Sequence, residues 1–388
     1  MSVNPFPGPQ PYRAADRGRF YGRDALIKKL ANQVLARAAT TVFGPSGAGK
    51  SSLLQAGVIP TLEDSDDIRL VRVDAWPAGE APLPWLVNAV ATELELGSPR
   101  QTEIALEALQ DTIDRAGRQS DRPVLVYLDQ FEQIFIAGHD EKALQDLLDG
   151  LTWLIRRKQN RELHLILSLR EDYLGRLRDW TREKPELTAH GFRVGPLTVG
   201  EMVKAMCQTA ADGDPPQMWN PEEISSLMLD VQVPGQKRGE GAEVQAAFAQ
   251  IVCRAVWEDR AAGKTMDMRR ANAEVILQNY LDTTLAELGT LRESALKLLE
   301  LQLIDDEGHR TLLTEKEARL VVPGADAIAV LTHLEKSAIL HAEEHQGSRY
   351  FELGHDWLAK KVFERRKERK QQEEIEAKDA QMRAERTR

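Results

Sequence analysis

The chain has 388 residues, of which 42% are apolar and 29% charged, and it carries a formal net charge of −10 with a pI of about 5.5. This is an ordinary globular balance over a length that allows two or three domains, and its acidity disfavours nucleic-acid binding. No segment approaches the roughly 18 apolar residues of a membrane span, and the N-terminus lacks a signal-peptide core, so we expect a cytoplasmic protein. The two cysteines, Cys207 and Cys253, match no metal-ligand spacing and indicate inert thiols.

The first half of the chain contains an alternation of strand and helix patterns. An extended proline-rich lead over residues 4–12 passes into an amphipathic helix that begins near "FYGRDALIKKL". Between residues 39 and 197, five apolar segments are typical of strands: "ATTVF", "IRLVRVDAW", "PVLVYLDQ", "LHLILSLR" and "FRVGPL". Helices are expected at 83–95, 101–117 and 141–158. This alternation predicts an α/β fold, a parallel sheet with helices on both faces.

The pattern changes after residue 197. Residues 198–288 are mostly helical, with a Pro/Gly-rich loop at "VQVPGQKRGEGAE". In residues 289–360, two helical segments precede "ILHAEE" and "RYFELGHD", which read as two strands joined by a tight turn. This order predicts a winged-helix domain, a type that binds DNA or serves as a packing module, and the acidic balance favours packing. Residues 361–388 hold ten Lys/Arg and seven Asp/Glu, which predicts a solvated single helix or a frayed linker rather than a coiled coil.

The segment "GPSGAGKS" carries the first chemical motif. Gly44, Gly49, Lys50 and Ser51 fill the Gly-x-x-x-x-Gly-Lys-Ser pattern between a strand and a helix, as a P-loop requires. Glycines let the backbone approach phosphate oxygens, and the N–H groups and helix N-terminus attract anions. Lys50 is expected to reach the β- and γ-phosphates, and the Ser51 hydroxyl to ligate Mg²⁺. The same nucleotide-contacting segment includes Pro45, Ser46, Gly47, Ala48 and Ser52, the last of which is better explained as structural.

The segment "VLVYLDQFEQIF" carries the second motif. Asp129 ends an apolar strand, where a Walker B acid orients Mg²⁺ and its waters. Glu132 is placed to polarise a water aimed at the γ-phosphate, which favours hydrolysis over phosphoryl transfer to a small molecule. The alternative for this pair is a strand followed by an acidic helix cap. Arg170 ends the next strand, where ligands of open α/β sheets bind, and either contacts the γ-phosphate or pairs with an acid such as Asp172.

These segments, in this order, resemble the STAND group of signal-transduction NTPases, and specifically its bacterial novel STAND branch, which is related to NB-ARC, NACHT and AAA+ proteins. The resemblance rests on seven segments: "NPFPGPQPYRAADRGRFYGRD", "FYGRDALIKKL", "GPSGAGKSSLLQAG", "YLDQFEQIF", "LSLREDYLGRL", "FRVGPLT" and "YFELGHDWLAKKV". It covers nearly the whole chain up to the charged tail. Two departures are Gln133, where the family often has a second acid, and Gly354, where related proteins have Met.

The resemblance implies a domain order and further site residues. It divides the chain into a lead with an adenine-side helix (1–38), a P-loop domain (39–197), a helical lid (198–288), a winged helix (289–360) and a charged helical linker (361–388). Gly22 and Arg23 would lie beside the adenine and ribose, and Pro196 would pack on the adenine. Arg170 would sense the γ-phosphate, and His355 would read the β-phosphate of ADP.

The resemblance also implies a function. An ATP/ADP switch with slow, Mg²⁺-dependent ATP hydrolysis would rest with ADP bound and form homo-oligomers with ATP, in bacterial signalling or defence. Effector and sensor parts would lie beyond this chain, on a longer protein or on partners. The alternative is an AAA+ initiator-type ATPase that acts on DNA, which the acidic pI disfavours. A small-molecule kinase would leave the lid, the winged helix and Glu132 without a role.

Overall fold

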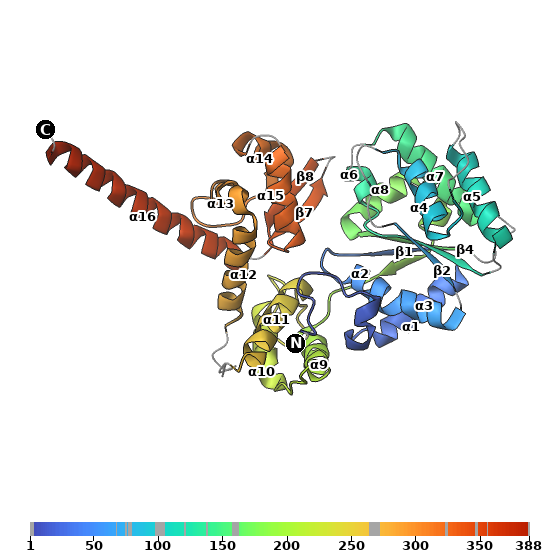
Figure 1. Cartoon of the computed structure of the whole chain (residues 1–388), viewed down its shortest axis with the longest axis horizontal. Helices are drawn as coiled ribbons and strands as arrows, with labels where there is room; N and C mark the ends of the chain where they lie inside the picture. The colour runs from blue at the N-terminus through green and yellow to red at the C-terminus, as the bar shows by residue number, and fades with distance from the viewer. Residues whose placement is uncertain are drawn as a thin grey trace.

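The computed structural model describes residues 4–66, 68–73, 76, 80–97, 105–119, 122–136, 139–156, 163–263, 272–322, 325–345, 348–354 and 356–386. A sheet-containing body lies at one end of the molecule, a helical region joins it to a smaller mixed unit, and one long helix projects from the far end (Figure 1). None of the described helices is long and apolar enough to cross a membrane.

Five parallel strands form the main sheet, in the order β2-β3-β4-β1-β5. Every residue of the central strand β4 is buried, as expected for a strand covered on both faces. The predicted α/β fold is therefore confirmed, although the last strand is shorter than expected because the chain leaves the sheet after Arg193 and turns toward the helical region. The strands are β1 (Ala39–Gly44), β2 (Arg69–Val73), β3 (Val124–Leu128), β4 (Leu163–Arg170) and β5 (Gly191–Arg193).

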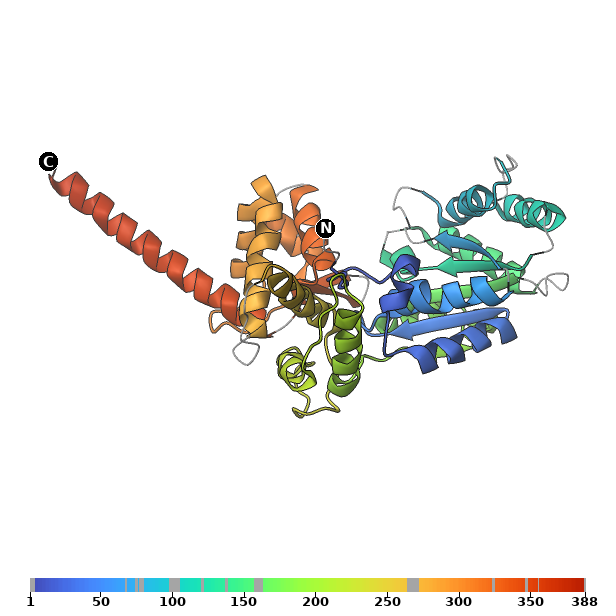
Figure 2. The same ribbon diagram turned by 60° about the horizontal axis from the view of Figure 1, so that its bottom comes forward.

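Helices cover both faces of this sheet because alternate strand residues point to opposite sides. Ile166 packs with α1 (Asp24–Ala36) and α3 (Ile59–Asp66) on one face. Its neighbours Leu165 and Leu167 pack with three helices on the other face, and both views show this division (Figures 1 and 2). These three are α4 (Pro82–Glu93), α5 (Ala105–Gln119) and α7 (Glu141–Arg156). Short helices complete the body: η1 (Ala14–Arg19), α6 (Gln133–Ile136), η3 (Glu171–Tyr173), α8 (Leu174–Trp180) and η4 (Pro185–Leu187).

The helical region begins at a capping box, in which Thr198 and Glu201 satisfy each other's backbone N–H groups. It contains α9 (Val199–Ala211), α10 (Pro221–Asp230), α11 (Ala246–Ala261) and α12 (Ala273–Glu287). One continuous apolar core joins these helices to the C-terminal unit and also takes in Phe6 from the lead.

The C-terminal unit combines helices with a three-stranded antiparallel sheet in the order β6-β8-β7. The two strands expected at its end are present as β7 and β8, and the winged-helix assignment stays a prediction. The elements are η5 (Gly289–Leu291), α13 (Arg292–Leu301), β6 (Leu313–Thr314), α14 (Glu315–Val321), α15 (Ala325–Lys336), β7 (Leu340–His345) and β8 (Ser348–Leu353).

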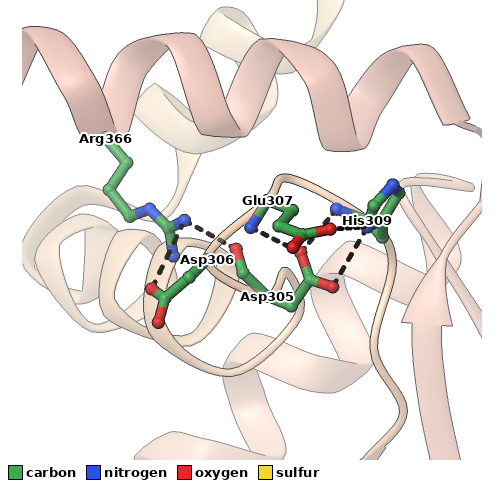
Figure 3. A network of polar contacts seen from close by, with 5 residues as sticks. All are labelled: Asp305, Asp306, Glu307, His309 and Arg366. Atoms are coloured by element: carbon green, nitrogen blue, oxygen red, sulfur yellow. Dashed lines mark hydrogen bonds and ion pairs between the residues drawn. The ribbon is translucent and has the colours of Figure 1, made fainter.

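The charged tail is one helix, α16 (Asp356–Arg386), and its first half is docked rather than free. Arg369 pairs with the buried Glu300 carboxylate of α13, with 2.6 Å between Nη2 and Oε2. Arg366 donates to the Glu300 and Asp305 carbonyl oxygens at 3.0 and 2.6 Å. Beneath it, the Asp305 carboxylate accepts the backbone N–H groups of Glu307 and His309, and these contacts lower the Asp305 pKa (Figure 3). The second half of α16 projects away from the body.

Gly44 gives a direct test of the sheet geometry. A Cβ atom at Gly44 would lie 2.1 Å from the Val194 carbonyl oxygen, and neither backbone can yield without breaking the sheet edge. We expect Gly44→Ala to lower the free energy of unfolding by about 1–3 kcal/mol or more. The control Gly175→Ala places its Cβ in open space in α8 and should be neutral or stabilising by up to about 1 kcal/mol. Equal melting temperatures for the two variants would contradict this geometry.

Candidate nucleotide-binding site

The P-loop connects β1 to a helix that runs without a break through α2 (Lys50–Ser52), the π-helical η2 (Leu53–Val58) and α3. Gly47 and Gly49 have φ of 73° and 84°, a left-handed conformation that favours glycine. The turn directs the loop toward the helix N-terminus, where unpaired backbone N–H groups attract anions. The predicted phosphate cradle therefore has the backbone it needs.

Lys50 folds back over this loop. Its Nζ donates to the carbonyl oxygens of Gly44 and Pro45 at 2.9 and 3.0 Å. Burial lowers the pKa of this ammonium group, and the nearby Glu132 carboxylate opposes the shift. A cation whose hydrogen bonds go to neutral carbonyl oxygens has much to gain from a phosphate partner.

Asp129 joins the end of β3 to the P-loop helix. Its buried carboxylate accepts the Ser51 hydroxyl at 3.2 Å and the Gln130 N–H at 3.0 Å, both through Oδ1. The structure thus brings together Ser51 and Asp129, the two predicted Mg²⁺ ligands, which lie 78 residues apart in the sequence. Mg²⁺ in nucleotide sites is bound by one or two such hard oxygen ligands together with substrate phosphates, so this pair fits the ion.

Glu132 lies buried beside the same sheet edge. Its Oε2 accepts the backbone N–H of Arg170 at 3.3 Å. Burial raises its pKa to about 7, although the positive charge of Lys50 opposes the shift. A carboxyl group with a pKa near neutrality has the acid–base properties of a general base. The alternative interpretation of Glu132 as a helix cap is not favoured by this contact, which goes to β4.

Arg170 stands beside Gly44 in the parallel register of β4 and β1. Its guanidinium group pairs with Asp172 through two contacts, Nη2 to Oδ2 at 2.9 Å and Nε to Oδ1 at 3.2 Å. Of the two interpretations that the sequence left open, the structure shows the pairing with Asp172. The sensor role of Arg170 stays a prediction.

The residues assigned to the adenine side also come together. Arg23 donates to the Gly195 carbonyl oxygen at 2.7 Å and to the Ala48 carbonyl oxygen at 3.3 Å, so it joins the lead to the P-loop and to the residue that precedes the half-buried Pro196. Gly22 has a φ of 83° and packs against α9, where a Cβ would lie 3.4 Å from that of Ala205.

His355 lies outside the described residues. The preceding residue, Gly354, donates its N–H to the Ile339 carbonyl oxygen and accepts the Gln245 side chain at 3.3 Å. The end of β8 is thereby anchored to the start of α11.

Two contacts at the site are missed by sequence reasoning. The Ser52 hydroxyl accepts the backbone N–H of Tyr12 at 3.2 Å, which supports a structural role for Ser52. Gln55 donates its Nε2 to Asp129 Oδ2 at 3.2 Å. The available signal for Gln55 was its position, a lone polar residue within "LLQAGV" and four residues after Ser51.

Comparison with solved structures finds proteins of similar architecture. ORC1 of Aeropyrum pernix, solved in complex with DNA, is 16% identical with a TM-score of 0.53, and covers 88% of this chain and 91% of its own. ORC2 of the same organism, solved with ADPNP and ADP, is 18% identical with a TM-score of 0.49. The match covers 91% of this chain and 95% of ORC2. A Walker-type ATPase of Pyrococcus abyssi is 15% identical over 91% and 98%, with a TM-score of 0.47. At these identities only the fold is shown, and that conclusion rests on ORC1.

Sequence comparison decides the family. No curated protein sequence matches the chain. The profile of the novel STAND NTPase 1 family matches residues 5–386, which is nearly the whole chain, and it confirms the resemblance that the seven segments indicate. The chain belongs to the novel STAND NTPase 1 family of P-loop NTPases.

Proposed function

We propose that the protein is an ATP/ADP-dependent signalling switch that rests with ADP bound and oligomerises in its ATP form. The observation that carries this proposal is the contact between β7 of the C-terminal unit and η3, the turn that directly follows Arg170. The unit that holds Gly354 and the predicted His355 therefore rests against the segment that would sense the γ-phosphate. A change at Arg170 can act on that contact directly.

The P-loop residues supply the nucleotide chemistry in this proposal. The loop N–H groups and Lys50 bind the phosphates, and Arg23 and Pro196 border the base. Bound Mg²⁺ would neutralise charge on the β- and γ-phosphates, with Ser51 and Asp129 as its protein ligands. Glu132 accepts a proton from the water whose oxygen attacks the γ-phosphorus. The bond from this phosphorus to the oxygen that bridges it to the β-phosphate breaks, and ADP and phosphate are the products.

Switching requires a difference in affinity between two shapes of the protein. To move a population from 1:99 to 99:1 takes about 5.5 kcal/mol of such difference. Arg170 provides part of it, because its guanidinium fork can engage either Asp172 or a γ-phosphate. The homo-oligomer, and the effector and sensor parts that respond, belong to the same proposal.

The alternative is an initiator-type ATPase that acts on DNA. The likeness to ORC1 shows the fold and leaves the choice open. Charge favours the switch: residues 313–354 of the C-terminal unit contain seven Asp/Glu and four Lys/Arg, a balance that repels phosphate backbones. Salt-sensitive binding to duplex DNA would favour the alternative.

The first experiment identifies the nucleotide that the protein retains. The purified protein is denatured, the released nucleotide is separated by chromatography, and particle size is measured with ADP and with a non-hydrolysable ATP analogue. Near-stoichiometric ADP and a larger particle with the analogue are expected. An empty site, fast ATP turnover and an unchanged particle size would contradict the switch.

Arg170 and Asp172 allow the sensing step to be tested. Asp172→Asn removes the charge that holds Arg170, so we expect the preference for a non-hydrolysable ATP analogue over ADP to rise about fivefold. Arg170→Ala should weaken binding of the ATP analogue and leave ADP affinity unchanged. Both affinities are measured by titration calorimetry. Equal losses for the two nucleotides in Arg170→Ala would argue against a sensor.

Glu132 predicts a pH dependence. The value of kcat/KM for ATP hydrolysis should rise with pH through about 7, where the free enzyme's carboxyl group loses its proton. Glu132→Gln should bind nucleotide normally and hydrolyse it about 100-fold more slowly. Wild-type turnover in Glu132→Gln would exclude it as the base.

The raised pKa also means that the folded protein keeps a proton that the unfolded chain releases, so this group's contribution to stability falls as pH rises from about 4.5 to about 7.

A further inference from the structure

Gln55 is a buried amide in an apolar part of the P-loop helix. Only 6% of its surface is exposed, and the residues around it in η2 are all buried. It follows Ser51 by four residues, which places both side chains on one face of the helix. Short π-helical segments such as η2 are frequent at functional sites.

Ser51 and Gln55 hold different oxygens of the same carboxylate. Ser51 donates to Asp129 Oδ1 and Gln55 donates to Asp129 Oδ2, each at 3.2 Å. The Asp129 main chain is fixed separately, since its N–H donates to the Val73 carbonyl oxygen at 2.8 Å and its own carbonyl oxygen accepts the Trp76 indole N–H at 3.3 Å. With the backbone held, the remaining freedom of Asp129 is rotation of its carboxylate. Ser51 and the Gln130 N–H hold Oδ1, and Gln55 restricts the rotation through Oδ2, the oxygen that they leave.

The chemistry of an amide suits this task. A lysine or arginine at position 55 would pair with Asp129 and reduce the negative charge offered to a cation. A carboxylate there would repel Asp129. An amide N–H donor orients the carboxylate and leaves its charge in place.

We propose that Gln55 is a positioning residue that fixes the Asp129 carboxylate with Oδ1 directed to the Ser51 side, where Mg²⁺ and nucleotide are proposed to bind. This inference rests on the proposed assignment of Ser51 and Asp129 to Mg²⁺. Gln55 touches neither the metal nor the nucleotide in this arrangement. Its loss therefore affects the gain in nucleotide affinity that Mg²⁺ provides, and leaves metal-free nucleotide binding to the loop and Lys50 intact.

The test compares nucleotide affinity with and without the metal. A fluorescent ADP is titrated into the full chain in Mg²⁺ and in EDTA, for the wild type and for Gln55→Met, which keeps the length and loses the donor. We expect the dissociation constant in EDTA divided by the dissociation constant in Mg²⁺ to fall about tenfold in Gln55→Met. The dissociation constant in EDTA should be unchanged. Gln55→Asn, whose shorter amide cannot span the contact, should lower this ratio as well. It replaces Gln55→Met if that variant folds poorly.

Controls separate this inference from the metal assignment. Thr152→Val removes a buried hydroxyl in α7, on the other side of the sheet, and should keep the wild-type ratio. One outcome is that Mg²⁺ increases nucleotide affinity in both Gln55 variants as it does in the wild type, and fails to do so in Asp129→Asn. This result would overturn the positioning role of Gln55 and leave the metal assignment in place. Equal weakening in Mg²⁺ and EDTA would assign Gln55 a purely structural role and overturn it too. A wild-type affinity that ignores Mg²⁺ would overturn the metal assignment together with this inference.

Discussion

The buried carboxylate of Asp129 is the constraint on which the site depends. A charge in this position is costly unless hydrogen bonds satisfy it, and its partners come from the P-loop helix as well as from its own turn. Because Ser51 and Gln55 must both reach it, the helix is fixed in distance and rotation against the end of β3. The close approach of Gly44 to Val194 fixes the other end of the loop. Contacts within the protein therefore hold the P-loop at both of its ends.

The lead over residues 4–12 carries this constraint to the helical region. Phe6 is buried and stacks on Trp219 with ring centres 5.2 Å apart. Tyr12 bonds to both sides, since its backbone N–H donates to Ser52 and its hydroxyl accepts Gln250 of α11 at 2.9 Å. A proline-rich segment suits such a strap because it loses little conformational freedom on ordering. The position of α11 thus depends on the first turn of the P-loop helix.

The sequence predicted those features that local patterns encode. The P-loop, the acid after β3 and the parallel sheet each have a short sequence signature. The P-loop and the acid lie close together because each follows a parallel strand, and parallel strands end at the same edge of the sheet. Contacts between distant residues have no such signature. Nothing in "LLQAGV" reveals that Gln55 meets an acid 74 residues away, and spacing could not choose between Asp172 and phosphate for Arg170. The docking of α16 was missed for the same reason, because its arginines match carbonyl and carboxylate groups of α13 that only the fold brings near.

Three polar side chains of the site already have partners within the protein. Lys50 holds two neutral carbonyl oxygens, Arg170 holds one carboxylate, and Ser51 holds Asp129. Nucleotide binding therefore exchanges partners, and the net free energy is the difference between phosphate and these internal groups rather than the full strength of the new contacts. The exchange is most favourable for Lys50, which gives up neutral partners. It is most nearly balanced for Arg170, which gives up a charged one that is about a quarter exposed. In the proposed switch, such a balanced exchange would let the Arg170 guanidinium group follow the state of the γ-phosphate, while Lys50 would bind the phosphates of either nucleotide.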